Sequence, residues 1–126
     1  MQYITMIIIV LGLACADFAT GLIKAYTGNK LHSAKMRKGG LNKLGEIIVM
    51  ATACGLEIGI KMLGQYYESE HLAAITGKIT AVAVFVYIVL MELVSILENY
   101  AEINTEAAWA RKIIQRLKKV NDKEDK

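Results

Sequence analysis

The chain has 126 residues, 55% of them hydrophobic, and contains no proline. A soluble domain this short has little interior in which to bury so much apolar surface, so the composition argues against a soluble enzyme or binding domain. The formal net charge of +3 is modest, but the basic residues are concentrated in two blocks.

Three apolar segments follow one another along the chain, and each is about 20 residues long, the length that a helix needs to cross ~30 Å of hydrocarbon. We therefore predict membrane-spanning helices at about residues 4–23, 44–64 and 75–97. The second segment contains three charged residues, so a helix lying on the membrane surface is an alternative. Its apolar residues surround the helix instead of forming one stripe, which favours a span.

The first segment also has one feature of a secretory signal peptide, because "ACAD" resembles a cleavage site. No Lys or Arg precedes the apolar run, unlike the charged start of a signal peptide. We therefore expect the segment to be retained as a span.

Charged residues between the spans predict the orientation. Residues 24–43 hold six Lys or Arg and no acid, residues 65–74 hold two acids and one His, and seven Lys or Arg follow from Arg111 onward. The positive-inside rule then places the basic loop and the tail in the cytoplasm and the N-terminus outside. Nucleic-acid binding is the alternative for a basic loop, but interleaved aromatic residues are missing, so no nucleic-acid partner is expected.

A fourth helix is predicted after the third span, and it divides the chain into a three-span domain, residues 1–103, and a C-terminal segment, residues 104–126. Asn104 or Thr105 can cap this helix. Its apolar stripe consists of Trp109, Ile113, Leu117 and Val120. The last residues, "NDKEDK", are expected to be disordered. The fold class is thus an all-α membrane protein with three transmembrane helices and a C-terminal amphipathic cytoplasmic helix.

Such a basic amphipathic helix commonly lies in the interface of an anionic membrane. A packing stripe used for self-association is the alternative. The residues that we assign to the membrane surface are Lys35, Arg37, Lys38, Trp109, Arg111, Lys112, Lys118 and Lys119.

Polar side chains also occur within the spans, where a charge costs roughly 2.5 to 3.5 kcal/mol unless it is paired, hydrated or neutralised. They share helix faces at spacings of three and four residues, and Glu57 and Lys61 can pair directly. The candidate lumen or pairing residues are Asp17, Thr20, Lys24, Glu46, Glu57, Lys61, Glu92, Ser95 and Asn99. Either these groups pair within the subunit, or they face neighbouring subunits and water; in neither case do they face lipid.

Small residues recur every four positions on two spans, which lets helices approach closely. The rows contain Gly12 and Ala16 on the first span, and Ala51, Gly55 and Gly59 on the second. They predict helix packing, either within one chain or between chains.

No catalytic, cofactor-binding or metal-binding site is predicted. His32 and His71 fall on opposite sides of the membrane in this topology, and the glycine-rich "RKGGLNKLG" lacks a phosphate-loop ending, so it is interpreted as a flexible turn. Cys15 and Cys54 lie inside apolar runs, which predicts reduced thiols and no metal site.

Two stretches of the sequence resemble the phage holin family, which includes toxin-secretion holins. "DFATGLIKAYTGNKLHSAKMRKGGLNKLGEI" contains, in the family's order, Asp17, Thr20-Gly21, the basic element Ser33 to Lys38, and Gly40-Leu41-Asn42-Lys43. "MELVSILENYAEI" is similar to a second element of the family, through Glu92, Leu93, Ser95, Ile96, Glu98 and Asn99. The likeness extends over most of residues 10–103.

The resemblance implies a small protein of the bacterial cytoplasmic membrane that forms homo-oligomers and then lesions. These lesions would release an endolysin or a toxin without binding it directly, in a membrane with anionic lipids. Two alternatives stay open: an oligomeric subunit of an ion channel or transporter, and a non-permeabilising antiholin or membrane anchor.

Overall fold

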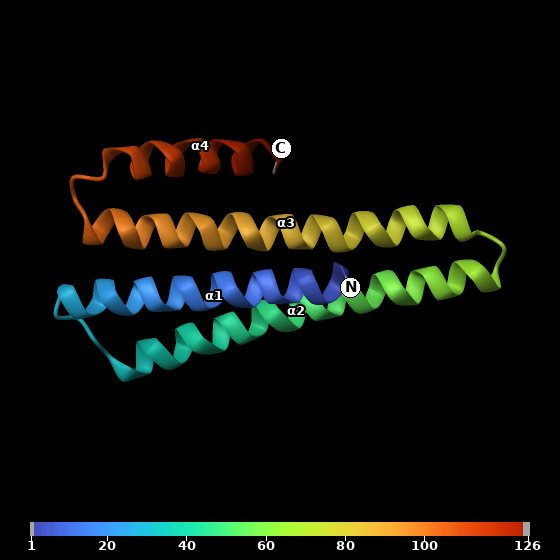
Figure 1. Cartoon of the computed structure of the whole chain (residues 1–126), viewed down its shortest axis with the longest axis horizontal. Coiled ribbons are helices and arrows are strands. Elements are labelled where there is room, and N and C mark those ends of the chain that lie inside the picture. The colour runs from blue at the N-terminus through green and yellow to red at the C-terminus, as the bar shows by residue number, and fades with distance from the viewer. Residues whose placement is uncertain (1, 125–126) are drawn as a thin grey trace.

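A computed structural model describes residues 2–124, and these residues form helices and no strands (Figure 1). The helices are α1 (Gln2–Thr27), α2 (Ser33–Tyr66), α3 (Glu70–Ile103) and α4 (Ala108–Glu124). The first three are each long and apolar enough to cross a membrane. The predicted fold class, all-α with three candidate transmembrane helices and a fourth, more polar helix, is confirmed.

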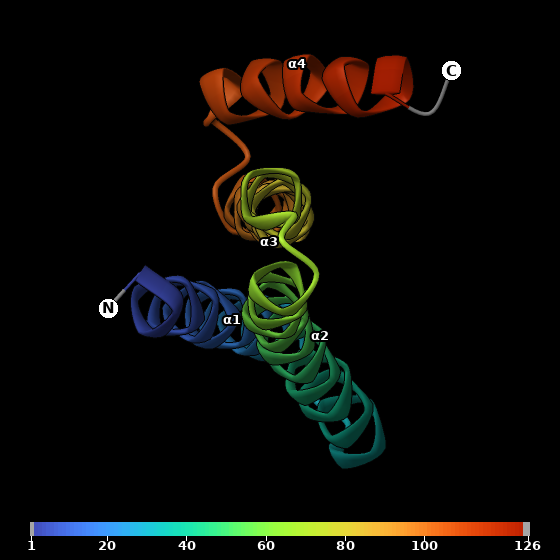
Figure 2. The ribbon, with the colours of Figure 1, turned by 90° about the vertical axis from the view of Figure 1, so that its right-hand side faces the viewer.

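Helix α3 is the centre of the arrangement, because it packs against each of the other three helices. Viewed along the bundle, α1 and α2 lie on one side of α3, and α4 crosses its opposite side obliquely (Figure 2). Helix α2 diverges from α3 toward Ser33, its first residue (Figure 2). The bundle is therefore tightest near the turn between α2 and α3 and widest at the opposite end.

The shared core of α1, α2 and α3 is narrow. It consists of Val10, Met50, Ala53, Cys54 and Ile88. In the most apolar 18-residue window of each long helix, only 17% of the residues of α1 and α3 and 28% of those of α2 are buried. The rest of the surface is largely apolar, with side chains such as Ile8 and Ile79 more than half exposed. Such a largely apolar outer surface is suited to contact with lipid.

The helices extend well beyond the predicted spans, which corrects the expected loops. Only residues 28–32 join α1 to α2, and only residues 67–69 join α2 to α3. The segment "RKGGLNKLG" is helical, so its interpretation as a flexible turn was wrong. Apolar length limits how much of a helix lies in hydrocarbon, but a segment without proline can continue as a helix into water.

A glycine permits the close approach of α2 and α3 beside their turn. A Cβ atom added to Gly64 would lie 2.3 Å from the Cβ of Ala73, which is far inside van der Waals contact. Because no side chain larger than hydrogen fits there, Gly64 fixes how closely the two helices can converge.

The start of α4 lies later than predicted. Asn104 ends α3, since its backbone N–H donates to the Tyr100 carbonyl at 2.8 Å. Its side-chain oxygen accepts from the Glu106 N–H at 3.2 Å, which stabilises the turn before α4 begins at Ala108. Asn104 and Thr105 therefore belong to the connection and do not cap α4.

Helix α4 also uses a different face from the predicted apolar stripe. Its buried residues are Ala110 and Ile114, which with Ala107 pack against Ala101 and the partly buried Val94 and Leu97 of α3. Of the predicted stripe, Leu117 is half-buried, whereas Trp109, Ile113 and Val120 are exposed. The helix continues to Glu124, so the disorder expected for residues 121–124 was wrong. Residues 125–126 lie outside the described range.

Candidate functional site in the spanning helices

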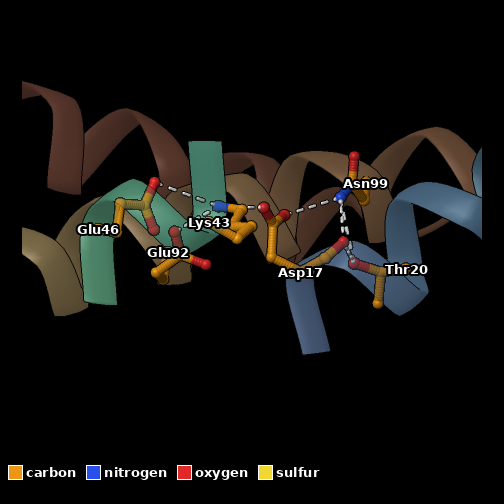
Figure 3. Close-up of polar contacts among 6 residues, drawn as sticks. All are labelled: Asp17, Thr20, Lys43, Glu46, Glu92 and Asn99. Carbon is orange, nitrogen blue, oxygen red and sulfur yellow. Dashed lines mark hydrogen bonds and ion pairs between the residues drawn. The ribbon is translucent and has the colours of Figure 1, made fainter. Parts of the chain in front are cut away.

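A cluster of polar side chains joins α1, α2 and α3, and Lys43 is at its centre (Figure 3). The Lys43 Nζ lies 2.7 Å from the Asp17 Oδ2 and 3.5 Å from the Glu46 Oε1, and it also contacts the Glu92 Oε1. Asp17 and Glu92 are 7% and 1% exposed. One lysine thus connects carboxylates from three helices. With Thr20 and Asn99, described next, we name these residues the three-helix cluster.

Asn99 of α3 completes the contacts of Asp17. Its Nδ2 donates to the Asp17 Oδ1 at 3.0 Å and lies 3.1 Å from the Thr20 Oγ1. The Thr20 hydroxyl in turn donates to the Asp17 backbone carbonyl at 3.0 Å. Both carboxylate oxygens of Asp17 therefore have a partner, one from α2 and one from α3. Asp17 links the polar faces of all three helices within one subunit.

The charges of the three-helix cluster do not balance. One lysine faces three carboxylates, and the second oxygens of Glu46 and Glu92 are buried without a hydrogen-bond partner. Buried carboxylate oxygens without a donor are costly in a low-dielectric environment. A hydrogen bond to one of these oxygens, from water or from another subunit, would therefore stabilise the cluster considerably.

A second polar group lies nearer the other end of the bundle, and we name Tyr3, Glu57 and Lys61 the tyrosine cluster. The Tyr3 hydroxyl donates to the Glu57 Oε1 at 3.1 Å, and the Lys61 Nζ lies 2.8 Å from the same oxygen and 3.0 Å from the Tyr3 hydroxyl. Glu57 is fully buried. Here one cation meets one anion, so the charges balance, although the second oxygen of Glu57, Oε2, is buried without a hydrogen-bond partner.

Helix α3 passes directly over Glu57 at Gly77. A Cβ atom added to Gly77 would lie 3.1 Å from the Glu57 Cα and from its carbonyl oxygen. This contact explains how a carboxylate side chain in a spanning helix becomes inaccessible: the glycine lets the α3 backbone cover it.

The structure brings most of the predicted polar residues together and separates the rest. The pair Glu57–Lys61 forms as expected from its spacing. Lys24 forms an ion pair with Glu102 at 3.5 Å, outside the three-helix cluster, and Ser95 is half-buried beside a cavity. Sequence reasoning missed Lys43 as a site residue, although its i, i+3 spacing to Glu46 was a usable signal.

The rows of small residues do not pack against other helices of the same subunit. Gly12, Ala16, Ala51 and Gly55 are exposed, and a Cβ added to Gly12, Gly55 or Gly59 would meet nothing within 4 Å. Packing within the chain through these rows was therefore a wrong expectation. Close contact between chains through them stays a prediction.

The residues assigned to the membrane surface lie on the exposed parts of α2 and α4. Lys118 differs from the others because its Nζ forms an ion pair with the Glu98 Oε1 of α3 at 2.6 Å. Trp109 packs beside Tyr100, with ring centroids 5.7 Å apart, and is still 55% exposed. Their contact with lipid stays a prediction.

Within residues 2–124 no group of three or more His, Cys, Asp or Glu side chains is arranged to hold a metal ion. The polar clusters instead do what charges inside a membrane protein must do: they pair, and they bind the helices to one another.

Comparison with known proteins gives one match. The family model described as the bacteriophage holin family matches residues 2–122, a range that includes all three candidate spans and most of α4. No curated protein and no solved structure matches the chain.

Proposed function

Because the chain belongs to the bacteriophage holin family, we propose that it oligomerises in the cytoplasmic membrane of a bacterial host and opens lesions there. An endolysin, or a secreted toxin, leaves the cell through these lesions without binding the protein directly. The role is non-enzymatic. The basic residues near the α1–α2 connection and in α4 support a topology with the N-terminus outside and the C-terminus inside.

The observation that carries this proposal is the three-helix cluster. A polar group of this size lies inside helices whose outer surfaces suit lipid, and two of its carboxylate oxygens have no donor. In a dispersed subunit the lysine holds the cluster closed. In an assembly, Asp17, Glu46, Glu92, Ser95 and Asn99 become the wetted face of the lesion, while the apolar faces stay in lipid.

The exposed rows of small residues supply a contact surface for assembly. Gly12 and Ala16 on α1, and Ala51 and Gly55 on α2, leave the helix backbones open to close approach by a neighbouring chain. Helices in lipid associate mainly through such close packing and through polar contacts. Both features suit a protein that changes from dispersed to assembled with its density in the membrane.

Release of size-graded dextrans from anionic liposomes, measured over a range of protein-to-lipid ratios, tests the proposal. We expect protein-sized dextrans to escape above a steep threshold. Leakage limited to ions would instead indicate a channel or transporter subunit. No leakage at any density would indicate an antiholin or an anchor.

Variants of the three-helix cluster sharpen this test. Asp17→Leu and Glu92→Leu remove carboxylates of the proposed wetted face, and we expect each to change the threshold or the rate of dextran release several-fold. Glu98→Leu is the matched control, because it removes a carboxylate from α3 that lies outside the cluster, in a pair with Lys118. If Asp17→Leu and Glu92→Leu release dextran as the parent does, the wetted face lies elsewhere.

A further inference from the structure

A cavity opens at the wide end of the bundle, between the end of α1, the start of α2 and the end of α3. Its volume is about 610 Å³. It exists because α2 diverges from α3 toward Ser33 (Figure 2) and because Gly39 of α2 faces Phe18 without a side chain of its own. The three-helix cluster forms the floor, since Asp17, Lys43 and Asn99 all line the cavity.

The lining of the cavity is basic. Four lysines, Lys24, Lys30, Lys35 and Lys43, and two acids line the cavity. Because Lys43 in the floor is shared with Glu46 and Glu92, the positive charge at the opening comes from Lys30 and Lys35. The acids are already paired: Asp17 with Lys43 at 2.7 Å, and Glu102 with Lys24 at 3.5 Å. Among residues 2–124, no carboxylate pairs with Lys30 or Lys35. These two lysines are the cations available to a ligand.

The start of α2 adds to the attraction for an anion. No side chain caps the helix at His32, and its first turn contains no acid. The first backbone N–H groups of a helix lack intrahelical partners and carry a positive partial charge, which favours phosphate. His32, Lys35 and Met36 from this end of α2 all line the cavity. The uncapped end and the two unpaired lysines therefore act on the same space.

The same cavity has an apolar side. Phe18, Leu22, Met36 and Ile103 contribute to its lining. It lies where the apolar part of α1 ends and basic residues begin, so its depth matches the boundary between hydrocarbon and headgroups. A free phosphate ion would use only the basic side, whereas a lipid uses both.

We propose that this cavity binds one anionic phospholipid, whose phosphate lies between Lys30, Lys35 and the start of α2, and whose acyl chain begins against Phe18, Leu22 and Met36. The bound lipid fills the wide end of the bundle above the three-helix cluster. This site goes beyond lesion formation, because lipid binding can be measured in a subunit that opens nothing.

The experiment is a titration of the full chain, purified in an uncharged detergent, with phosphatidylglycerol and separately with phosphatidylcholine, followed by native mass spectrometry. We expect one saturable phosphatidylglycerol and no equivalent phosphatidylcholine. The double variant Lys30→Gln/Lys35→Gln should bind phosphatidylglycerol about tenfold more weakly, because it removes both unpaired cations.

The matched control is Arg37→Gln/Lys38→Gln, which removes the same charge from the neighbouring part of the chain, in α2, but from residues that do not line the cavity. It should bind the lipid as the parent does. Circular dichroism confirms that both double variants are folded. Equal weakening in the two variants would overturn the site, since it would show general attraction to the basic surface.

Two further outcomes also overturn the proposal. Equal retention of phosphatidylcholine would show that the anion plays no part. Displacement of the lipid by millimolar inorganic phosphate would show that the phosphate group alone is recognised, and the lipid assignment would fall. Dextran release by Lys30→Gln/Lys35→Gln separates this result from the proposed function, because loss of the lipid site and loss of lesions are scored independently.

Discussion

The two polar clusters each place one lysine against buried carboxylates, and each contains a buried carboxylate oxygen without a donor, but they differ in charge balance. In the tyrosine cluster, Lys61 meets Glu57 one helical turn away on the same helix, and Tyr3 contributes a donor. In the three-helix cluster, Lys43 meets carboxylates from three helices. The first is balanced in charge within the subunit, and the second is not. The difference indicates that the three-helix cluster joins the helices more strongly. It also indicates that a new hydrogen-bond donor or cation would stabilise the three-helix cluster more than the tyrosine cluster.

Removal of each lysine tests this comparison with the largest expected effect. Lys43→Met leaves three carboxylates without a cation, and we expect a loss of about 3 kcal/mol or more in the free energy of unfolding. Lys61→Met should cost less, since it leaves one carboxylate without a cation instead of three, and Tyr3 still donates to Glu57. Unfolding in mixed micelles with increasing dodecyl sulfate measures both.

A compensating change makes this first prediction more stringent. Adding Glu92→Gln to Lys43→Met removes one of the uncompensated charges and should recover part of the lost stability. The comparison between the clusters would be refuted by equal losses for the two lysine variants, or by no recovery in the double variant.

The close approach of α3 to Glu57 gives the second prediction. In Gly77→Ala the new methyl group would meet the Glu57 backbone at 3.1 Å, so α3 must move and partly uncover the carboxylate. We expect a loss of about 1 to 3 kcal/mol, as for other overpacked sites. Gly55→Ala is the control, because its methyl group meets nothing within 4 Å and alanine favours a helix. Similar stability of the two variants would show that Gly77 does not determine how closely α3 approaches the Glu57 backbone.

The contrast between the clusters also explains what the sequence could predict. The spans follow from apolar length, and the Glu57–Lys61 pair follows from spacing on a single helix. The role of Lys43 depends on how three helices meet, which local spacing does not encode. Its position just before the apolar run suggested a loop residue, but the helix begins ten residues earlier, at Ser33.

Helix α4 shows the same limit at the level of packing. Hydrophobicity selected Trp109, Ile113, Leu117 and Val120 as the apolar stripe, facing either the membrane or another helix, but small residues decide how closely two helices approach. Ala107 and Ala110 let α4 pack against Ala101 of α3. The larger side chains remain outside, where the sequence pattern alone could not distinguish a lipid-facing stripe from a packing stripe.

The tyrosine cluster offers the smallest expected effect and a direct test of how Lys61 and Tyr3 share the Glu57 Oε1. Tyr3→Phe removes one donor from the Glu57 Oε1 and leaves Lys61 at 2.8 Å from the same oxygen. We expect a loss of about 1 kcal/mol in the free energy of unfolding, the usual net contribution of one hydrogen bond. Asn99→Ala in the three-helix cluster is the natural comparison. There the Asp17 Oδ1 loses the Asn99 amide as its donor, so the loss should be greater than for Tyr3→Phe. If Tyr3→Phe proves the more damaging of the two, then Lys61 alone does not stabilise the Glu57 Oε1, and the charge balance of the tyrosine cluster does not make it the more stable of the two clusters.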